Sequence, residues 1–169
     1  MRTSARAILL NGDNFLVMDR NKFGHKYMAL IGGKVEANET PIQAVIREVK
    51  EETTLDVTNP RLVIVEDAGD VFGTHYIYLC DYSGGNISLE PTSTEYKINE
   101  LGQNLYKPMW INKNDLASVN LLPVELKEKL VEYLENGFPN EPINIKAKDW
   151  LWQLKYSEHS QFLEHYFLF

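Results

Sequence analysis

The alternation of apolar and polar residues predicts β-strands over much of the first two thirds of the chain. Strands are predicted at 2–10, 13–20, 27–31, 59–65, 74–82 and 107–112, where β-branched and aromatic residues are enriched. The first two flank Asn11-Gly12-Asp13, which is a hairpin signal. The third ends at Gly32-Gly33. A pattern of this kind predicts a sheet built largely from short strands.

Helical spacing appears in two places. Residues 40–53 have apolar positions at i, i+3, i+4 and i+7, which predicts one apolar face made of Ile42, Val45, Ile46 and Val49. Thr40 and Gln43 have the spacing of a capping box, and Pro41 suits the first helical position. Residues 123–136 predict a second helix, which Gly137 ends. The polar stretch 86–104 between the strands reads as a long loop.

The last segment, 138–169, is rich in aromatic residues. They are Phe138, Trp150, Trp152, Tyr156, Phe162, Tyr166, Phe167 and Phe169. An aromatic segment of this kind is expected to be covered, either by its own domain or by a second subunit. We therefore predict one domain over residues 1–137 with a C-terminal extension over 138–169, and a homodimer is one of the two arrangements left open.

Composition narrows the possible partners. The chain has 169 residues, which fits one ordinary domain, and its formal net charge is −7. A surface of that sign repels a nucleic-acid backbone, so polymeric DNA or RNA is not the expected partner. The N-terminus has no secretory pattern and no apolar run is long enough to span a membrane, so we expect a cytoplasmic protein without a membrane partner.

Three carboxylates gather on one side of the first predicted helix. Glu48, Glu51 and Glu52 cluster away from the apolar face, and like charges at this spacing repel. Hard divalent cations remove that penalty, because Mg²⁺ and Mn²⁺ prefer carboxylate, carbonyl and water oxygens. The alternative is an ordinary solvated helix face, in which Arg47 forms a plain salt bridge with Glu51.

Residues 33–55 resemble the Nudix box, G-x5-E-x7-R-E-U-x-E-E-x-G-U, in which U is aliphatic. The matching residues are Gly33, Glu39, Arg47, Glu48, Val49, Glu51, Glu52 and Leu55. The surrounding sequence is similar to the MutT-like branch of that family, and the order of elements agrees with it from residue 2 to about residue 136. Two positions depart from the pattern: Thr54 replaces a glycine, and Ile31 replaces a proline that often precedes the two glycines. Thr54 would be strained if it is left-handed.

The resemblance implies a fold, an activity and a cofactor. The fold is of the α/β (α+β) class, with a mixed β-sheet sandwiched between helices. The activity is Mg²⁺-dependent pyrophosphohydrolysis of a nucleoside triphosphate or a nucleoside diphosphate derivative, with Mn²⁺ as a possible substitute. By carry-over, the metal ligands are Glu48, Glu51, Glu52 and the Gly32 carbonyl, with Glu39 as a more distant or water-mediated ligand.

The resemblance also implies the role of Arg47 and the kind of general base, and the other site residues are candidates chosen from their position in the chain. Arg47 is expected to orient the glutamates. The general base is either a glutamate of the box or an acid from the polar stretch, where we select Glu95 over Glu90 and Glu100. Lys34 is a candidate phosphate contact. Apolar and stacking candidates for the rest of the substrate are Phe23, Tyr27, Phe72, Tyr76, Tyr78 and Trp110, and His25 and Asn120 are polar candidates.

Two other classes of function remain open. A Nudix fold can sense a nucleotide without turning it over, because fold does not fix function. An interaction protein is the other alternative, in which the aromatic extension matters most. The substrate is open among an oxidised purine triphosphate, an ordinary dNTP, ADP-ribose and a sugar nucleotide.

Overall fold

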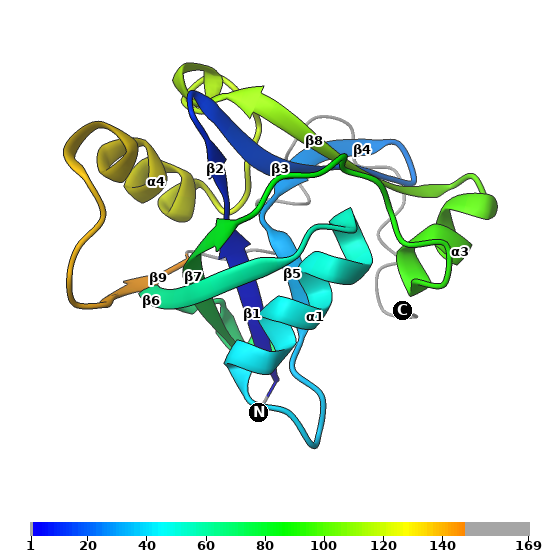
Figure 1. The fold of residues 1–169 in the computed structure, drawn as a ribbon, viewed down its shortest axis with the longest axis horizontal. Helices are drawn as coiled ribbons and strands as arrows, with labels where there is room; N and C mark the ends of the chain where they lie inside the picture. Colours follow the sequence, from blue (N-terminus) through cyan, green and yellow to red (C-terminus); the bar gives the residue numbers. More distant parts are fainter. Residues whose placement is uncertain (1, 148–169) are drawn as a thin grey trace.

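The computed structural model describes residues 2–147, which form two β-sheets and the helices that cover them (Figure 1). The five-stranded sheet has the order β5-β1-β7-β6-β9 and is mixed, because β1 pairs with β7 and β6 with β9 in parallel. Its strands are β1 Thr3–Ile8, β5 Ile31–Lys34, β6 Val57–Asp67, β7 Thr74–Tyr82 and β9 Ile143–Lys146. The predicted mixed α+β class is confirmed.

The second sheet is antiparallel and centres on β3. Its strands are β2 Leu10–Asn11, β3 Asn14–Lys22, β4 His25–Ala29 and β8 Asn104–Asn112. β3 pairs with β8 along its whole length and with β2 and β4 on its other side. The hairpin predicted at residues 11–13 is formed between β2 and β3. The strand predicted at 27–31 is interrupted at Leu30, so β4 and β5 belong to different sheets.

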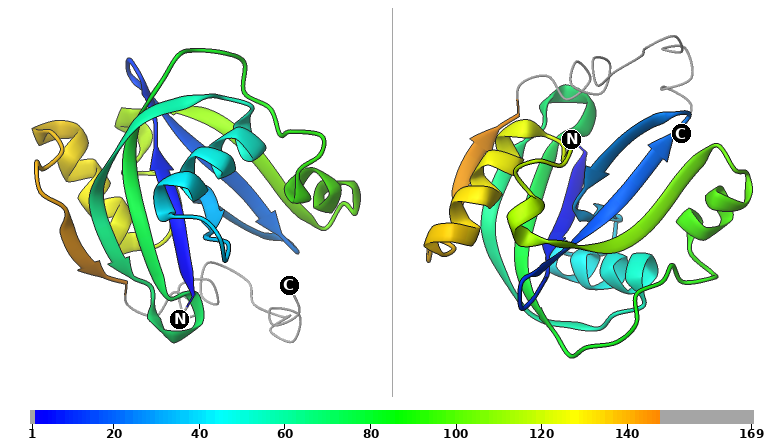
Figure 2. Two further views of the ribbon diagram at one scale, coloured as in Figure 1. Left: turned by 60° about the horizontal axis from the view of Figure 1, so that its bottom comes forward. Right: turned by 90° about the horizontal axis from the view of Figure 1, so that it is seen from above.

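The helices are α1 Pro41–Thr53, α2 Gly69–Phe72, α3 Thr94–Glu100 and α4 Val124–Asn136, with a 3-10 turn at Lys113–Asp115. Two of the helices, α1 and α4, cover opposite faces of the five-stranded sheet (Figure 2), and α3 packs on β8 of the second sheet. One core cluster packs Val45 and Val49 of α1 against Ala5 and Ala7 of β1, and a second gathers residues of α4 with Ile8. The side chains of β1 alternate between these two cores, as a two-residue period requires.

Helix α1 begins as predicted but presents a different face to the core. Thr40 Oγ1 accepts from the Gln43 N–H at 3.3 Å, and Gln43 Oε1 accepts from the Thr40 N–H at 2.8 Å, so the capping box is confirmed. Ile42 and Ile46 are 44% and 40% exposed, so the predicted apolar face is wrong for both. Their place toward the core is taken by a face that includes Glu48.

Helix α2 was not predicted, and two further elements, α3 and β9, were also missed. The polar stretch 86–104 contains α3, whose N-cap Ser93 accepts through Oγ from the Tyr96 N–H at 3.1 Å. The interpretation of this stretch as a loop is therefore wrong for its second half. β9 extends the sheet beyond α4, so the first part of the aromatic-rich extension packs on the domain. The rest of that extension, 148–169, lies outside the described residues.

A buried carboxylate–imidazole pair joins β6 to β7. Glu66 is fully buried, and its Oε2 lies 2.7 Å from Nδ1 of His75. Burial lowers the pKa of His75, against the opposing effect of its hydrogen bond with the Glu66 carboxylate. Within residues 2–147, the second oxygen of Glu66 is buried with no hydrogen-bond partner. Such a group costs free energy in the folded state.

Candidate functional site

Two consecutive glycines bring the backbone of β5 against α1. Gly32 has a φ of 131°, and a Cβ at this position would overlap the Ala5 carbonyl on β1, so only glycine fits. Its N–H donates to Oε2 of Glu52 at 2.7 Å. At Gly33 a Cβ would overlap the carboxylate of Glu48. Gly33 therefore leaves room for Glu48 to lie directly against the strand, and Gly32 lets β1 approach closely while its N–H binds Glu52.

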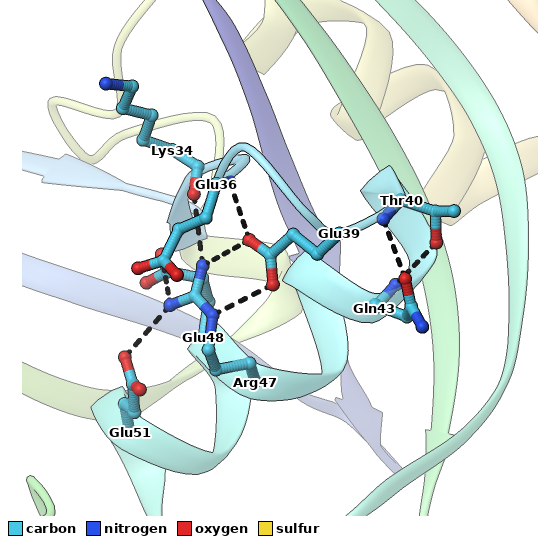
Figure 3. A network of polar contacts seen from close by, with 8 residues as sticks. All are labelled: Lys34, Glu36, Glu39, Thr40, Gln43, Arg47, Glu48 and Glu51. Carbon is cyan, nitrogen blue, oxygen red and sulfur yellow. Dashed lines mark hydrogen bonds and ion pairs between the residues drawn. The ribbon is translucent and has the colours of Figure 1, made fainter.

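Arg47 ties the polar residues of this region together (Figure 3). Its guanidinium donates to both carboxylate oxygens of Glu39, at 2.7 and 3.1 Å. One nitrogen, Nη1, contacts Glu48 at 2.9 Å and Glu51 at 3.1 Å, and Nη2 donates to the Lys34 carbonyl at 3.1 Å. The bond to Glu39 is the main cause of the raised pKa of Arg47, and it also lowers the pKa of Glu39. Glu39 thus holds Arg47 in the orientation that spans the other two carboxylates.

The two buried glutamates carry strongly perturbed pKa values. Burial raises the pKa of Glu48 to about 7, although Arg47 opposes the shift. Burial and the neighbouring Glu48 raise the pKa of Glu52 to about 8. Glu95, in the first turn of α3, makes a smaller contribution that raises the pKa of both, so its charge lies within electrostatic reach of this pair. Carboxylates with raised pKa values in this arrangement lack enough positive charge to stabilise their ionised forms.

Arg6 is a member of the site that sequence reasoning missed. It pairs in register with Gly32 across β1 and β5, and its Nη1 donates to the Gly32 carbonyl. The same nitrogen lies 3.4 Å from the Leu30 carbonyl. Arg6 also lowers the pKa of Glu48 and Glu52. The available signal was a cation in the middle of an otherwise apolar strand segment.

A row of side chains on the second sheet also belongs to the surroundings of the glutamates. Tyr27, Arg20 and Tyr106 are directly opposite one another on β4, β3 and β8. The Arg20 guanidinium lies 3.3 Å from the centre of the Tyr106 ring and 5.8 Å from that of Tyr27. Burial raises the pKa of Tyr106, and Glu95 and Glu52 add to the shift. Tyr106 therefore lies within electrostatic reach of the acidic cluster.

The structure places the other predicted residues at varying distances from this centre. Tyr27 and His25 are buried in β4. Asn120 holds its own segment against β4, because its carbonyl accepts from the Met28 N–H and its side-chain amide donates to the Lys26 carbonyl. The Lys34 side chain is exposed and extends away from the carboxylates (Figure 3). Glu90 is fixed through its backbone N–H to the Glu51 carbonyl, and its carboxylate takes no part in the ion pairs that Arg47 forms with Glu39, Glu48 and Glu51.

The oxygen-rich composition of the site fits a hard divalent cation. Glu48 and Glu52 offer buried carboxylates, and the absent Cβ of Gly33 leaves the space that the Glu48 carboxylate fills. As the side chains lie in residues 2–147, no group of three or more His, Cys, Asp and Glu is arranged to hold a metal. Glu51 is turned toward Arg47, and Arg6 holds the Gly32 carbonyl. For the predicted ligands to bind one cation together, Glu51 would have to leave Arg47 and the Gly32 carbonyl would have to leave Arg6.

No helix in the described part of the chain has the length and apolar character needed to cross a membrane.

Comparison of the sequence with known proteins identifies relatives of this chain. A model of the NUDIX domain matches residues 1–119. The NAD-capped RNA hydrolase NudC of Pectobacterium atrosepticum is 30% identical over 80 residues, which is 47% of this chain and 31% of that protein. The chain spans about a third of the length of the curated relatives that it matches.

Solved structures share the fold at low sequence identity. An ADP-ribose pyrophosphatase from Streptococcus suis matches with a TM-score of 0.61 and 21% identity, over 85% of this chain and 98% of that one. The mutator protein MutT from Bacillus halodurans matches with a TM-score of 0.59 and 17% identity, over 86% of this chain and 90% of that one.

Proposed function

The chain belongs to the Nudix family, and on that premise we propose that it is a Mg²⁺-dependent pyrophosphohydrolase. Its substrate is a nucleoside triphosphate or a nucleoside diphosphate derivative, and Mn²⁺ is expected to substitute for Mg²⁺. The proposal agrees with the relatives, because NudC and the pyrophosphatase from Streptococcus suis are named for acting on nucleotide derivatives. In this chain, the observation that supports it is the pair of buried carboxylates Glu48 and Glu52, whose raised pKa values show that too little positive charge lies nearby to stabilise their ionised forms.

The ligands of the cation are drawn from α1 and β5. Glu48, Glu51, Glu52 and the Gly32 carbonyl would hold it, with Glu39 acting through Arg47. When bound, a divalent cation neutralises charge on the diphosphate oxygens and makes a bound water more acidic. Arg47 keeps Glu48 and Glu51 in reach of one another while no cation separates them. Arg6 is expected to turn from the Gly32 carbonyl to a substrate phosphate, because its guanidinium matches phosphate geometry.

Glu95 is the general base that the arrangement supports best. It lies in the first turn of α3, and its charge acts on both Glu48 and Glu52. A carboxylate in this position can accept a proton from the attacking water at one of its own oxygens. The alternatives Glu90 and Glu100 are not among the leading causes of the pKa shift of either carboxylate. Glu100 lies at the opposite end of α3 from Glu95.

The substrate's nucleoside is expected to meet the row on the second sheet. Within this row, Tyr27 supplies a ring and Arg20 supplies a planar cation beside that ring. His25 and Asn120 flank this row from β4 and its neighbouring segment, and Lys34 lies at the exposed rim. These contacts suit a small nucleotide. A polymeric nucleic acid is not proposed, because the chain is strongly acidic.

A nucleotide panel tests the proposal directly. Purified protein with about 10 mM Mg²⁺, as metal-dependent hydrolysis requires, is expected to release a nucleoside monophosphate from at least one nucleotide. Glu52→Gln is expected to lower kcat by at least about a hundredfold, since one electrostatic contact to the reacting group is worth that much. The matched control is Glu128→Gln, an equal charge change at an exposed position of α4. Tight binding without turnover across the panel would instead identify a nucleotide sensor.

A further inference from the structure

An open groove lies between α3, β8 and the segment before α3. Its volume is about 550 Å³, which is in the range of small-molecule sites. Its apolar lining includes Leu89, Tyr96 and Tyr106, and its polar lining includes Asn99, Glu100 and Lys107. We call it the α3 groove. None of the residues assigned above to the metal or to catalysis lines it.

The walls of the α3 groove are fixed by hydrogen bonds. Asn99 of α3 donates to the Tyr106 carbonyl at 2.8 Å and accepts from the Tyr106 N–H at 2.7 Å, which docks the helix on β8. On the other side, the Ser88 N–H donates to the Thr53 carbonyl at 3.1 Å and the Glu90 N–H to the Glu51 carbonyl at 2.8 Å. One wall is therefore attached to the last turn of α1, which carries Glu51 and Glu52.

The α3 groove and the acidic cluster share a boundary. Tyr106 lines the groove and also carries the Arg20 guanidinium on its ring, 3.3 Å from the ring centre. Tyr96 follows Glu95 directly in the chain, so the groove begins one residue from the carboxylate that faces Glu48 and Glu52. Figure 1 shows α3 beyond the C-terminal end of α1 and far from α4, which places the groove on the side of the acidic residues.

The lining indicates the kind of group that fits. Tyr96 is 39% exposed and offers an open ring face for stacking. Lys107 and Glu100 bring one charge of each sign, so the groove has no net preference for a phosphate. Asn99 uses its amide on the Tyr106 backbone. A neutral ring that bears hydroxyl or amide groups matches this mixture of aromatic faces, donors and acceptors.

The spacing across the second sheet fits a substrate with two such rings. Tyr27 and Tyr106 are separated by two strand spacings, or about 10 Å. Arg20 lies between them. A diphosphate that joins two ring-bearing groups spans a gap of this order. Its charges would lie near the Arg20 guanidinium, its nucleoside at Tyr27 and its second ring at Tyr106.

We propose that the α3 groove binds the second ring-bearing group of a nucleoside diphosphate derivative, on the far side of the scissile diphosphate from the nucleoside. This inference rests on the proposed function and narrows its substrate class. It favours a nucleoside diphosphate linked to a sugar or to a second nucleoside over a nucleoside triphosphate, whose terminal phosphate has no ring to place in the groove.

Two substrates with the same adenosine test the proposal. The kcat/KM of wild-type protein is expected to be at least about tenfold higher for ADP-ribose than for ATP, since one well-placed ring contact discriminates by that factor. Tyr96→Ala is expected to raise KM for ADP-ribose about tenfold with little change in kcat, and to leave kcat/KM for ATP within about twofold. The control variant is Leu101→Ala, which removes an apolar side chain 77% exposed at the end of α3.

The two failures are distinguishable. If both substrates change alike in Tyr96→Ala, or neither changes, the groove does not bind the second group, whatever the activity. If the wild type turns over no nucleotide, the proposed function fails. ADP-ribose then stays intact, and calorimetric titration in Mg²⁺ tests the groove alone. Weaker binding of ADP-ribose by Tyr96→Ala but equal binding of AMP would support it, and equal binding of ADP-ribose by both proteins would overturn it.

Discussion

At the scale of single residues, Glu52 stores unfavourable free energy that a cation would remove. Its raised pKa of about 8 means that the folded protein holds a proton that the unfolded chain releases at lower pH. Stability from this group is therefore lost as pH rises from its ordinary value near 4.5 through about 8. This cost fits the proposed role of Glu52 as a metal ligand, because functional sites commonly trade stability for function.

We predict that Glu52→Gln stabilises the metal-free protein. At pH 8.5 the free energy of unfolding is expected to rise by about 1–2 kcal/mol, because a buried charge is removed while an amide oxygen can still accept from the Gly32 N–H. Urea denaturation in EDTA measures this. Mg²⁺ should then stabilise the wild type but not the variant. An unchanged or lower stability of Glu52→Gln in EDTA would contradict the conclusion that the buried charge of this carboxylate destabilises the folded protein.

The buried imidazole of His75 leads to a prediction of pH dependence. Its pKa is lowered, so at mildly acidic pH this histidine binds a proton in the unfolded chain but not in the folded protein. Stability from this group is complete above the ordinary histidine pKa of 6.5 and is lost as pH falls below it. Between pH 7 and 5.5, the wild type is expected to lose stability more steeply than His75→Gln, by up to about 1.4 kcal/mol per pH unit.

The comparison uses slopes, because the substitution also changes the surroundings of Glu66 and so alters stability at every pH. Arg2 and Arg6 face the same imidazole and lower its pKa further, so their charges belong to the same environment. Urea midpoints at four pH values for both proteins suffice. Parallel curves would show that His75 does not titrate differently in the folded and unfolded states.

At the scale of elements, the exit from α1 shows how the chain accommodates a residue unsuited to its conformation. Thr54 is left-handed, with φ 63° and ψ 0°, where a β-branched side chain costs about 1–2 kcal/mol. Its hydroxyl lies 3.0 Å from the Asn86 carbonyl, across the chain, and its N–H donates to the Lys50 carbonyl. The expected strain is therefore present, and a tertiary hydrogen bond offsets part of it.

We predict that the two effects separate in two substitutions. Thr54→Val keeps the strain and loses the bond to Asn86, so the free energy of unfolding should fall by about 1–2 kcal/mol. Thr54→Gly loses the bond but relieves the strain, and should lie within about 0.5 kcal/mol of the wild type. Chemical denaturation of the three proteins checks this, with Thr54→Ser as the variant that keeps the hydroxyl. Equal stability of the Val and Gly variants would show that strain is unimportant here.

The local sequence pattern was sufficient to predict elements that begin or end with clear signals, such as α1. The capping box, Pro41 and the box carboxylates predicted the start of α1 and the polar cluster of the site. The same pattern was misleading for Ile42 and Ile46, because hydrophobicity alone placed them in the core. In the structure, Gly33 leaves space for Glu48 and the Gly32 N–H binds Glu52, so both glutamates are buried while both isoleucines are exposed. A tertiary contact of this kind leaves no trace in helical periodicity.

The partners of the site were beyond sequence reasoning for a related reason. Arg6, Arg20 and Tyr106 reach the acidic cluster only because strands distant in sequence pair in a particular register. Helix α3 was missed because it is short and polar, and its main signal is the N-cap Ser93. β9 was missed because four alternating residues are too few to distinguish a strand from the rest of the extension.

At the scale of the whole molecule, the site lies where three layers meet. Helix α1 supplies the carboxylates, β1 and β5 supply Arg6 and the glycines, and the second sheet supplies Arg20 with its tyrosines. The second core, around α4, contains none of these groups. β9 closes that second core by pairing with β6, so it is expected to contribute to stability with no direct part in the site.

A truncation series makes this division testable. Ending the chain at Gly137 removes the β9–β6 ladder, the Phe138 ring that lies 5.7 Å from Tyr133, and the packing of Ile143 and Ile145 on the second core. Relative to a chain ending at Ala147, the free energy of unfolding is expected to fall by about 2–4 kcal/mol. Urea denaturation and sedimentation are to be measured on both truncated chains and on the full chain, since a homodimer through the extension stays a prediction.

Two point variants keep the prediction testable if the shorter chain fails to fold. Ile145→Ala removes a half-buried side chain that packs on the second core, and Asn144→Ala alters its exposed neighbour on the same strand. The first should lower stability by about 1–2 kcal/mol and the second by less than about 0.5 kcal/mol. Because both leave α1 and the second sheet intact, kcat/KM should not change in either. Equal stability of the two variants would mean that β9 lies on the sheet without supporting the core beneath it.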